Sequence, residues 1–276
     1  MATALFVAFI VFSMIFGCVI GSFLNVVIYR IPEGKTIVKG HSMCMSCGHE
    51  LGALDLFPVF SWLFLKGKCR YCKAPISSRY IKIESFTGLA FALMAFTHRY
   101  CMIDLNYSIT VSAVALFICF CIVLLDWCGL IASMMIYHDH GKGMYGFAVF
   151  SGLCAVAYWM VYSLCFNEWY EIFTSFLTSV SLALLMVGFL ALCCSLVKKK
   201  YDANDFWLDI NFAFFYTFFG KFIVEYALII SAYLILGILP RFITKSTKYE
   251  KYGGIIEMVG VLVLTIVGYV LRTFLN

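Results

Sequence analysis

Long, uninterrupted apolar runs constrain this chain more than any other feature. Of its 276 residues, 63% are hydrophobic and only 13% are charged, against about 25% charged residues in an ordinary soluble domain. In lipid, backbone N–H and C=O groups must be hydrogen-bonded within the protein, so only helices or closed barrels cross a bilayer. The runs are continuous rather than alternating, which favours helices over barrel strands. The sequence therefore predicts an all-α polytopic membrane protein.

About eight transmembrane helices are expected from the positions of these runs. The expected spans lie near residues 4–28, 81–98, 107–125, 144–166, 172–197, 206–220, 222–239 and 254–274. The first run is too long for the core of a signal peptide and no basic residue precedes it, so we expect a retained helix. The expected organisation is a first helix in 1–29, a polar loop in 30–80 and a helical bundle in 81–276.

The basic residues support a single orientation for these spans. With the spans placed as above, all Lys and Arg residues except Arg99, Lys221 and Arg272 fall on the same side of the membrane. Loops rich in Lys and Arg stay in the cytoplasm. We therefore expect a cytoplasmic loop at 30–80 and both termini on the outer side.

The polar loop carries two Cys-x-x-Cys pairs with about twenty residues between them: Cys44 with Cys47, and Cys69 with Cys72. This spacing is typical of a metal knuckle with four thiolate ligands. Thiols in the cytoplasm are kept reduced, which favours a metal over disulfides. Four sulfurs complete a tetrahedron and leave no open position, so a structural zinc is expected, although iron accepts the same ligands.

Three stretches around this loop carry a family resemblance. They are residues 21–32 (GSFLNVVIYRIP), residues 55–62 with 66–72 (DLFPVFSW and KGKCRYC), and residues 77–84 (SSRYIKIE). In this order they resemble the bacterial type IV prepilin peptidases. The resemblance is dense over 18–90 and thin over 90–276. It implies an aspartyl endopeptidase of the bacterial inner membrane, which removes the basic leader of prepilin-like or pseudopilin proteins at the cytoplasmic face.

The resemblance also implies two catalytic carboxylates on different helices. They share a proton, one activating water as base and the other protonating the scissile carbonyl as acid. The first corresponds to Asp126, expected at the cytoplasmic end of the third span. The family has a Pro several residues later, and residues 127–133 contain none. The alternative interpretation of Asp126 is an interfacial residue that marks a helix end.

The second catalytic Asp of the family ends a Gly-x-Gly-Asp motif at the start of a later helix. The matching position is Asp205, where Asp202 and Asn204 replace the two glycines. Asp209 is the rival, since it lies one helical turn further on the same face. The alternative to a catalytic role, for both residues, is a helix cap or a solvated position in the first helical turn.

A second activity is implied by the resemblance alone. Many family members methylate the new N-terminus with S-adenosylmethionine, and Glu84 matches a family Glu four residues after Tyr80. Glu84 is therefore the candidate cofactor-binding residue, with an interfacial charge at a helix start as the alternative. The sequence contains no glycine-rich strand–helix turn of the kind that binds nucleotides.

Two other functions remain open. The missing Pro and glycines would suit a non-catalytic relative that binds pilin-like helices or assembly partners. A transporter is less favoured, since no pair of broken helices stands at matching positions in two halves. The expected partners are prepilin-like proteins and the lipid bilayer, with no nucleic acid.

Overall fold

The computed structural model describes residues 2–38, 40–97, 111–166 and 203–216, with a few single residues between 170 and 188. Every regular element in these parts is a helix, and none is a β-strand, which agrees with the predicted all-α class. The chain divides into two compact units, Met1–Phe96 and Thr97–Asn276.

Three described helices are long and apolar enough to cross a membrane. They are α1 (Ala2–Arg30), α5 (Val111–His140) and α6 (Tyr145–Phe166). They confirm the spans expected near 4–28 and 144–166 and overlap the one expected near 107–125.

The expected count of eight spans is not reached in the described residues. Helix α3 (Arg79–Thr97) and the described helix α8 (Ala203–Tyr216) form where spans were expected, but neither is among the candidate membrane spans of the described residues, and residues 217–220 of the expected span lie outside them. The expected spans 222–239 and 254–274, and most of 172–197, lie outside the described residues.

Helix α5 is much longer than predicted, and this changes the place of Asp126. We expected a helix that ends at residue 125, whereas α5 continues to His140. The expectation was wrong because residues 127–136 are themselves largely apolar and contain no Pro that would end a helix. Asp126 thus lies near the middle of α5, about 21 Å from its last residue at 1.5 Å rise per residue.

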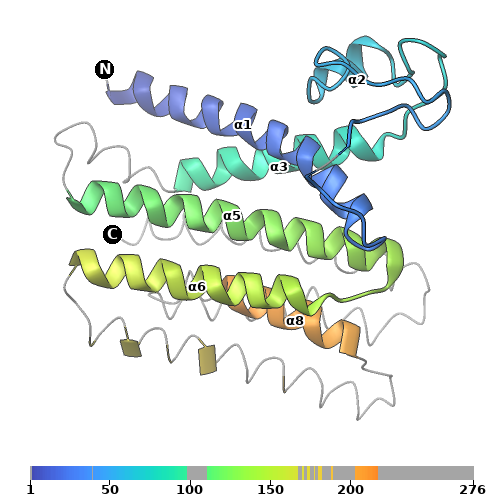
Figure 1. Cartoon of the computed structure of the whole chain (residues 1–276). Helices are drawn as coiled ribbons and strands as arrows, with labels where there is room; N and C mark the ends of the chain where they lie inside the picture. The colour runs from blue at the N-terminus through green and yellow to red at the C-terminus, as the bar shows by residue number, and fades with distance from the viewer. Residues whose placement is uncertain are drawn as a thin grey trace, which may run out of the picture. The chain divides into compact units, whose positions relative to one another are not determined.

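In the N-terminal unit, α1 and α3 lie against each other (Figure 1), and glycines form their closest contacts. A Cβ atom on Gly21 would lie 2.8 Å from the backbone Cα of Glu84, and one on Gly88 would lie 2.4 Å from the Cys18 sulfur. Gly17 and Gly21 form a Gly-x-x-x-Gly motif, and Gly17 packs against Phe91 and Gly88. Such motifs let membrane helices approach because no side chain separates the backbones.

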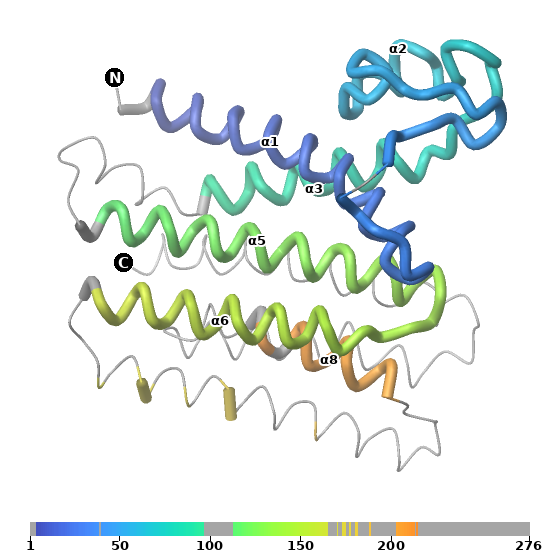
Figure 2. Tube along the Cα trace, viewed as in Figure 1, coloured from blue at the N-terminus to red at the C-terminus, as the bar shows by residue number. Residues whose placement is uncertain are grey.

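In the C-terminal unit, α5 and α6 form an antiparallel hairpin joined by a short turn (Figure 2). The Cys119 thiol contacts the carbonyl oxygen of Tyr158 at 3.8 Å, and Gly129 packs against Phe150. Helix α8 lies along both helices of the hairpin and runs parallel to α6.

Two contacts set the register of α8 against α6. The backbone N–H of Gly143 donates to Asn204 Oδ1 at 3.1 Å. Further along, the Ser151 hydroxyl donates to the carbonyl oxygen of Asn211 at 3.4 Å. The start of α8 therefore lies at the α5–α6 turn, and later residues of α8 lie deeper along the hairpin.

We predict that Gly21→Ala destabilises the α1–α3 contact, because the new methyl group would meet the backbone of α3. Overpacking of this kind costs about 1–3 kcal/mol. Thermal unfolding of the purified protein should show a lower midpoint than wild type. Gly146→Ala is the matched control, because nothing lies within 4 Å of the added Cβ. Equal midpoints for Gly21→Ala and wild type would contradict the prediction.

Candidate metal centre and buried acidic residues

The four loop cysteines converge as the sequence predicts. Their sulfur atoms all lie within 4.8 Å of one another, and the Cys44 and Cys72 sulfurs are 3.8 Å apart. Two ligands of a tetrahedral zinc with 2.3 Å Zn–S bonds are about 3.8 Å apart. All four cysteines are free of disulfides. The donor set therefore fits one tetrahedral metal ion, with zinc as the best match.

The two halves of the centre repeat the same backbone pattern. In the first, the N–H of Cys44 donates to the carbonyl oxygen of His49, and the N–H of Gly48 donates to the carbonyl oxygen of Cys44. In the second, the N–H of Cys69 donates to the carbonyl oxygen of Ala74, and the N–H of Lys73 donates to the carbonyl oxygen of Cys69. Isolated β-bridges flank both halves, between Met43 and Glu50 and between Lys68 and Pro75. Each Cys-x-x-Cys pair is thus one knuckle of a two-fold repeated unit, which we had not predicted.

The residue after each knuckle adopts a left-handed backbone conformation. Gly48 has φ of 69° and Lys73 has φ of 61°. Glycine adopts this conformation without strain, whereas it costs other residues about 1–2 kcal/mol of conformational free energy. The second knuckle therefore carries strain that the first avoids, and the Lys73 ammonium donates to the Arg70 carbonyl at 2.9 Å.

The thiols differ in acidity, which bears on metal binding. The backbone N–H groups of Cys47 and Ser46 lower the pKa of the Cys44 thiol to about 6. At Cys72, the backbone N–H of Ala74 acts in the same direction, but desolvation and three neighbouring sulfurs outweigh it and raise the pKa to about 11. Four thiolates so close together therefore need a cation, because like charges repel at this range.

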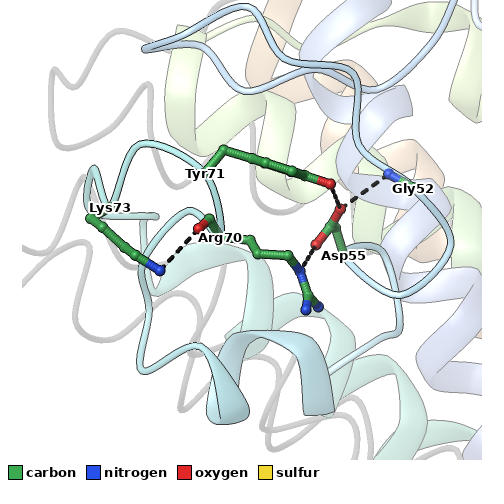
Figure 3. A network of polar contacts seen from close by, with 5 residues as sticks. All are labelled: Gly52, Asp55, Arg70, Tyr71 and Lys73. Atoms are coloured by element: carbon green, nitrogen blue, oxygen red, sulfur yellow. Dashed lines mark hydrogen bonds and ion pairs between the residues drawn. The ribbon is translucent and has the colours of Figure 1, made fainter.

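Asp55 joins the segment between the knuckles to the second knuckle (Figure 3). Its carboxylate accepts from Arg70 Nε at 2.6 Å, from the Tyr71 hydroxyl at 3.2 Å and from Gly52 N–H at 3.2 Å. The hydrogen bond from Arg70 lowers the pKa of Asp55. Both donor side chains stand between Cys69 and Cys72 in the chain, so the network holds the metal-binding turn against the loop.

A ring contact connects the two knuckles to each other. The rings of His49 and Tyr71 lie with centroids 3.5 Å apart. The His41 side chain is paired with Glu50 at 2.7 Å instead of joining the sulfur cluster. Neither histidine is among the clustered ligands found in the described residues.

Glu84, the candidate cofactor residue, is buried at the junction of the loop and the helices. Its Oε2 accepts a hydrogen bond from the backbone N–H of Val59 at 2.7 Å, and Ser22 of α1 lies beside it. Val59 has φ of 63°, so this bond stabilises a backbone conformation that β-branched residues rarely adopt. In this structure Glu84 links α3 to the loop.

Asp126 lies at the centre of the hairpin of the second unit. It is 0% exposed, and neither carboxylate oxygen has a hydrogen-bond partner among the described residues. The nearby Ser151 hydroxyl donates instead to the Asn211 carbonyl. The Asn211 side chain is also buried, and both of its amide atoms lack partners within the same part of the chain. Buried polar groups without partners are costly, which points to a site.

The two candidates for the second carboxylate differ in environment. Asp205 is half-buried in the first turn of α8 and accepts a hydrogen bond from the Tyr137 hydroxyl. Asp209 lies one turn deeper and is 2% exposed. Ser151 lies beside Asp126 and contacts Asn211, so Asn211 marks the level of Asp126 along α8. Along the axis of α8, Asp209 is about 3 Å from Asn211, and Asp205 is about 9 Å from it.

Ser151 and Asn211 were not singled out from the sequence. Both stand in apolar segments, where an isolated Ser or Asn usually has a local helical partner. The only sequence signal is that Asn211 follows Asp209 by two residues. They lie close together because of how α6 packs against α8, and no local sequence pattern predicts that packing.

Comparisons with known proteins support the resemblance over the first part of the chain. Residues 15–98 match the family model of the bacterial peptidase A24 N-terminal domain. Over these residues the chain is similar to the type IV prepilin peptidase family. The matched region contains the entire metal centre, Asp55 and Glu84.

The curated relatives are named prepilin leader peptidase/N-methyltransferase. That of Myxococcus xanthus is 48% identical over 83 residues, which is 30% of this chain and 25% of the relative. That of Dichelobacter nodosus is 34% identical over 138 residues, 40% of this chain and 48% of the relative. That of Vibrio cholerae is 40% identical over 100 residues, 33% of this chain and 37% of the relative.

The chain therefore spans less than half the length of these peptidase-family relatives in the matched regions. No solved structure matches the chain significantly.

We predict that one zinc ion is bound per chain and that Cys69→Ser releases it, since three sulfurs cannot close the tetrahedron. Elemental analysis of purified protein should give about one zinc per wild-type chain. Cys121→Ser is the control, because this exposed cysteine lies on α5 outside the sulfur cluster. Retention of the full zinc content in Cys69→Ser would contradict the assignment.

A second prediction concerns the left-handed residue of the first knuckle. Gly48→Ala should weaken metal retention by about 1–2 kcal/mol, since a Cβ disfavours φ of 69°. Lys73→Gly should strengthen it by relieving the same strain. The chelator concentration that removes half the zinc measures both effects. Gly52→Ala serves as control, because its Cβ would meet only Asp55 Oδ2 at an ordinary 3.8 Å. Identical midpoints for Gly48→Ala and Gly52→Ala would count against the role of the turn.

Proposed function

We propose that this protein is an aspartyl endopeptidase of the bacterial inner membrane that removes the basic leader of prepilin-like or pseudopilin substrates at the cytoplasmic face. The observation that carries the proposal is Asp126, fully buried and without a partner in the described residues, near the middle of a helix apolar enough to span a membrane. An ionisable residue in that position is costly and is retained where it has a function. The family match of residues 15–98 supports the same activity.

Asp126 is proposed as one catalytic carboxylate, and Asp205 and Asp209 as the candidates for the other. Sequence position favours Asp205, which stands where the family motif ends. Burial and helix register favour Asp209, which is 2% exposed and lies closer than Asp205 to the level of Asn211 along α8. We therefore propose the pair Asp126 and Asp209, with Asp205 as the alternative.

The proposed chemistry follows from two carboxylates in a water-poor interior. They cannot both ionise at close range, so they hold one proton between them. The ionised carboxylate removes a proton from water, and the protonated one donates to the oxygen of the scissile carbonyl. The Asn211 amide, with a free donor and a free acceptor among its described neighbours, is suited to hold the water or the peptide.

The proposed orientation places the metal-binding loop in the cytoplasm. The segment 30–79 carries eight Lys or Arg and three Asp or Glu, and such loops remain on the cytoplasmic side. The metal would be structural, because four sulfurs leave no position open for a substrate.

N-methylation of the new N-terminus is proposed as a second activity of the same protein. It rests on the printed names of the relatives. Glu84 would be the residue that binds S-adenosylmethionine, although its carboxylate here accepts from Val59 N–H.

The alternative function is that of a non-catalytic relative that binds pilin-like helices or assembly partners. It is favoured by the unbroken α5, which lacks the family Pro, and by the contacts around the altered motif. Asn204 accepts from Gly143 N–H and Asp205 from Tyr137, so both residues help to close the α5–α6 turn onto α8.

We predict that Asp126→Asn and Asp209→Asn each lower the cleavage rate of a prepilin-like substrate by about 10²–10⁴-fold, the usual contribution of a general acid or base. The assay uses membranes that contain the full chain. Asp139→Asn is the control, because this residue lies at the end of α5 beside His138. Circular dichroism of each purified variant tests whether it is folded.

The other outcomes are equally informative. Loss of cleavage in Asp205→Asn with retention in Asp209→Asn would assign the second carboxylate to Asp205. Unchanged cleavage in Asp126→Asn would reject the proposed mechanism. No cleavage by wild type with a matched substrate would favour the non-catalytic relative. The mass of the product N-terminus shows whether a methyl group has been added.

A further inference from the structure

The short helix α2 (Phe60–Phe64) presents an exposed apolar surface on the metal-binding loop. Phe60, Leu63 and Phe64 lie at i, i+3 and i+4, so their side chains share one face of the helix. They are 52%, 52% and 81% exposed, and Phe57 is 56% exposed beside them. The ring of Phe60 lies 5.6 Å from that of Phe57 and 6.3 Å from that of Phe64. We call these four residues the aromatic ridge.

Two hydrogen bonds hold the segment that carries the ridge, one to helix α3 and one to the loop before it. The backbone N–H of Val59, directly before α2, donates to Glu84 Oε2 at 2.7 Å. Within α2, the indole N–H of Trp62 donates to the carbonyl of Ile76 at 3.2 Å. The Trp62 ring covers Gly67, where a Cβ would lie 2.8 Å from it. Trp62 thus faces the loop, while its neighbours in the ridge face outward.

This attachment sets the ridge at the level of the membrane boundary. Glu84 lies five residues after the start of α3, and its Cα packs against Gly21. Gly21 belongs to the candidate membrane span Ala4–Arg30 of α1. A segment bonded to Glu84 is therefore held beside the apolar part of α1, rather than at the far end of a polar loop.

Charge supplies the second argument for a membrane partner. Lys66 and Lys68 follow α2 directly, and both are exposed. The loop as a whole has eight basic and three acidic residues between 30 and 79. Aromatic residues beside lysines are typical of segments that lie in the interface of an anionic bilayer. Phosphate headgroups would meet the lysines, and acyl chains would cover the rings.

We propose that the aromatic ridge inserts into the interface of the lipid bilayer and docks the metal-binding loop flat on the membrane. Exposed apolar patches of this kind usually mark a contact surface. The occupant is the membrane because the ridge is bonded at the level of α1 and is followed by lysines. The docked loop would lie beside the helices that it joins. This proposal does not depend on the proposed peptidase activity.

The test uses the full chain in nanodiscs that contain anionic phosphatidylglycerol and a lipid with a photoreactive group on its acyl chain. After illumination, mass spectrometry locates the modified residues. Phe60, Leu63 and Phe64 should be labelled about as strongly as Phe12 and Phe16, which are exposed on α1. Val38 and Met45 are the matched controls, because they are 86% and 77% exposed in the same loop. Labelling of the ridge should exceed theirs about fivefold or more.

A second arm examines the lysines without altering the ridge. Lys66→Glu with Lys68→Glu should reduce ridge labelling in phosphatidylglycerol nanodiscs, because anionic headgroups would then repel the loop. Equal labelling of the ridge and of Val38 and Met45 would overturn the proposal. So would strong photocrosslinking of the ridge to an added prepilin-like helix that displaces the lipid label, since the ridge would then be a substrate surface.

Discussion

The polar loop depends on the electrostatics of four sulfur atoms held within 4.8 Å of one another. The backbone lowers the pKa of Cys44, whereas desolvation and the neighbouring sulfurs raise that of Cys72, and a cation would favour the thiolate form of the set. A segment of this size has little apolar core of its own, and a metal bound by the four cysteines would supply the missing stability. The repeated knuckle pattern and the Asp55 network then build outward from this centre.

The junction of the loop with the membrane helices is made by small residues and one buried carboxylate. Gly17, Gly21 and Gly88 allow α1 and α3 to touch through their backbones. In that contact, Glu84 reaches the strained Val59 and holds α2 in place. The region that matches the peptidase family is therefore one physical unit, in which helix packing positions the loop.

The second unit shows how a changed motif alters local packing. Without a Pro, α5 continues as one helix past Asp126. Asn204 and Asp205, which stand at the altered motif, bond to Gly143 and Tyr137 and close the turn of the hairpin. Asp126, Ser151 and Asn211 remain together in the interior. Among the described residues, the polar groups thus divide into a contact at the helix turn and a buried group around Asp126, and the buried group has the water-poor surroundings that the proposed acid–base chemistry would use.

Composition and spacing alone determined the helical class, the membrane-spanning helices and the clustering of the four cysteines, because each depends on local pattern: apolar runs for helices and Cys-x-x-Cys pairs for a tetrahedral set of sulfurs. The length of α5 was misjudged, since a single Asp was taken as a helix end although the apolar run continues. The polar residues that lie near Asp126, the contacts of Glu84 and the position of the aromatic ridge were decided by tertiary packing. These features depend on the register between helices distant in the chain, which no local pattern encodes.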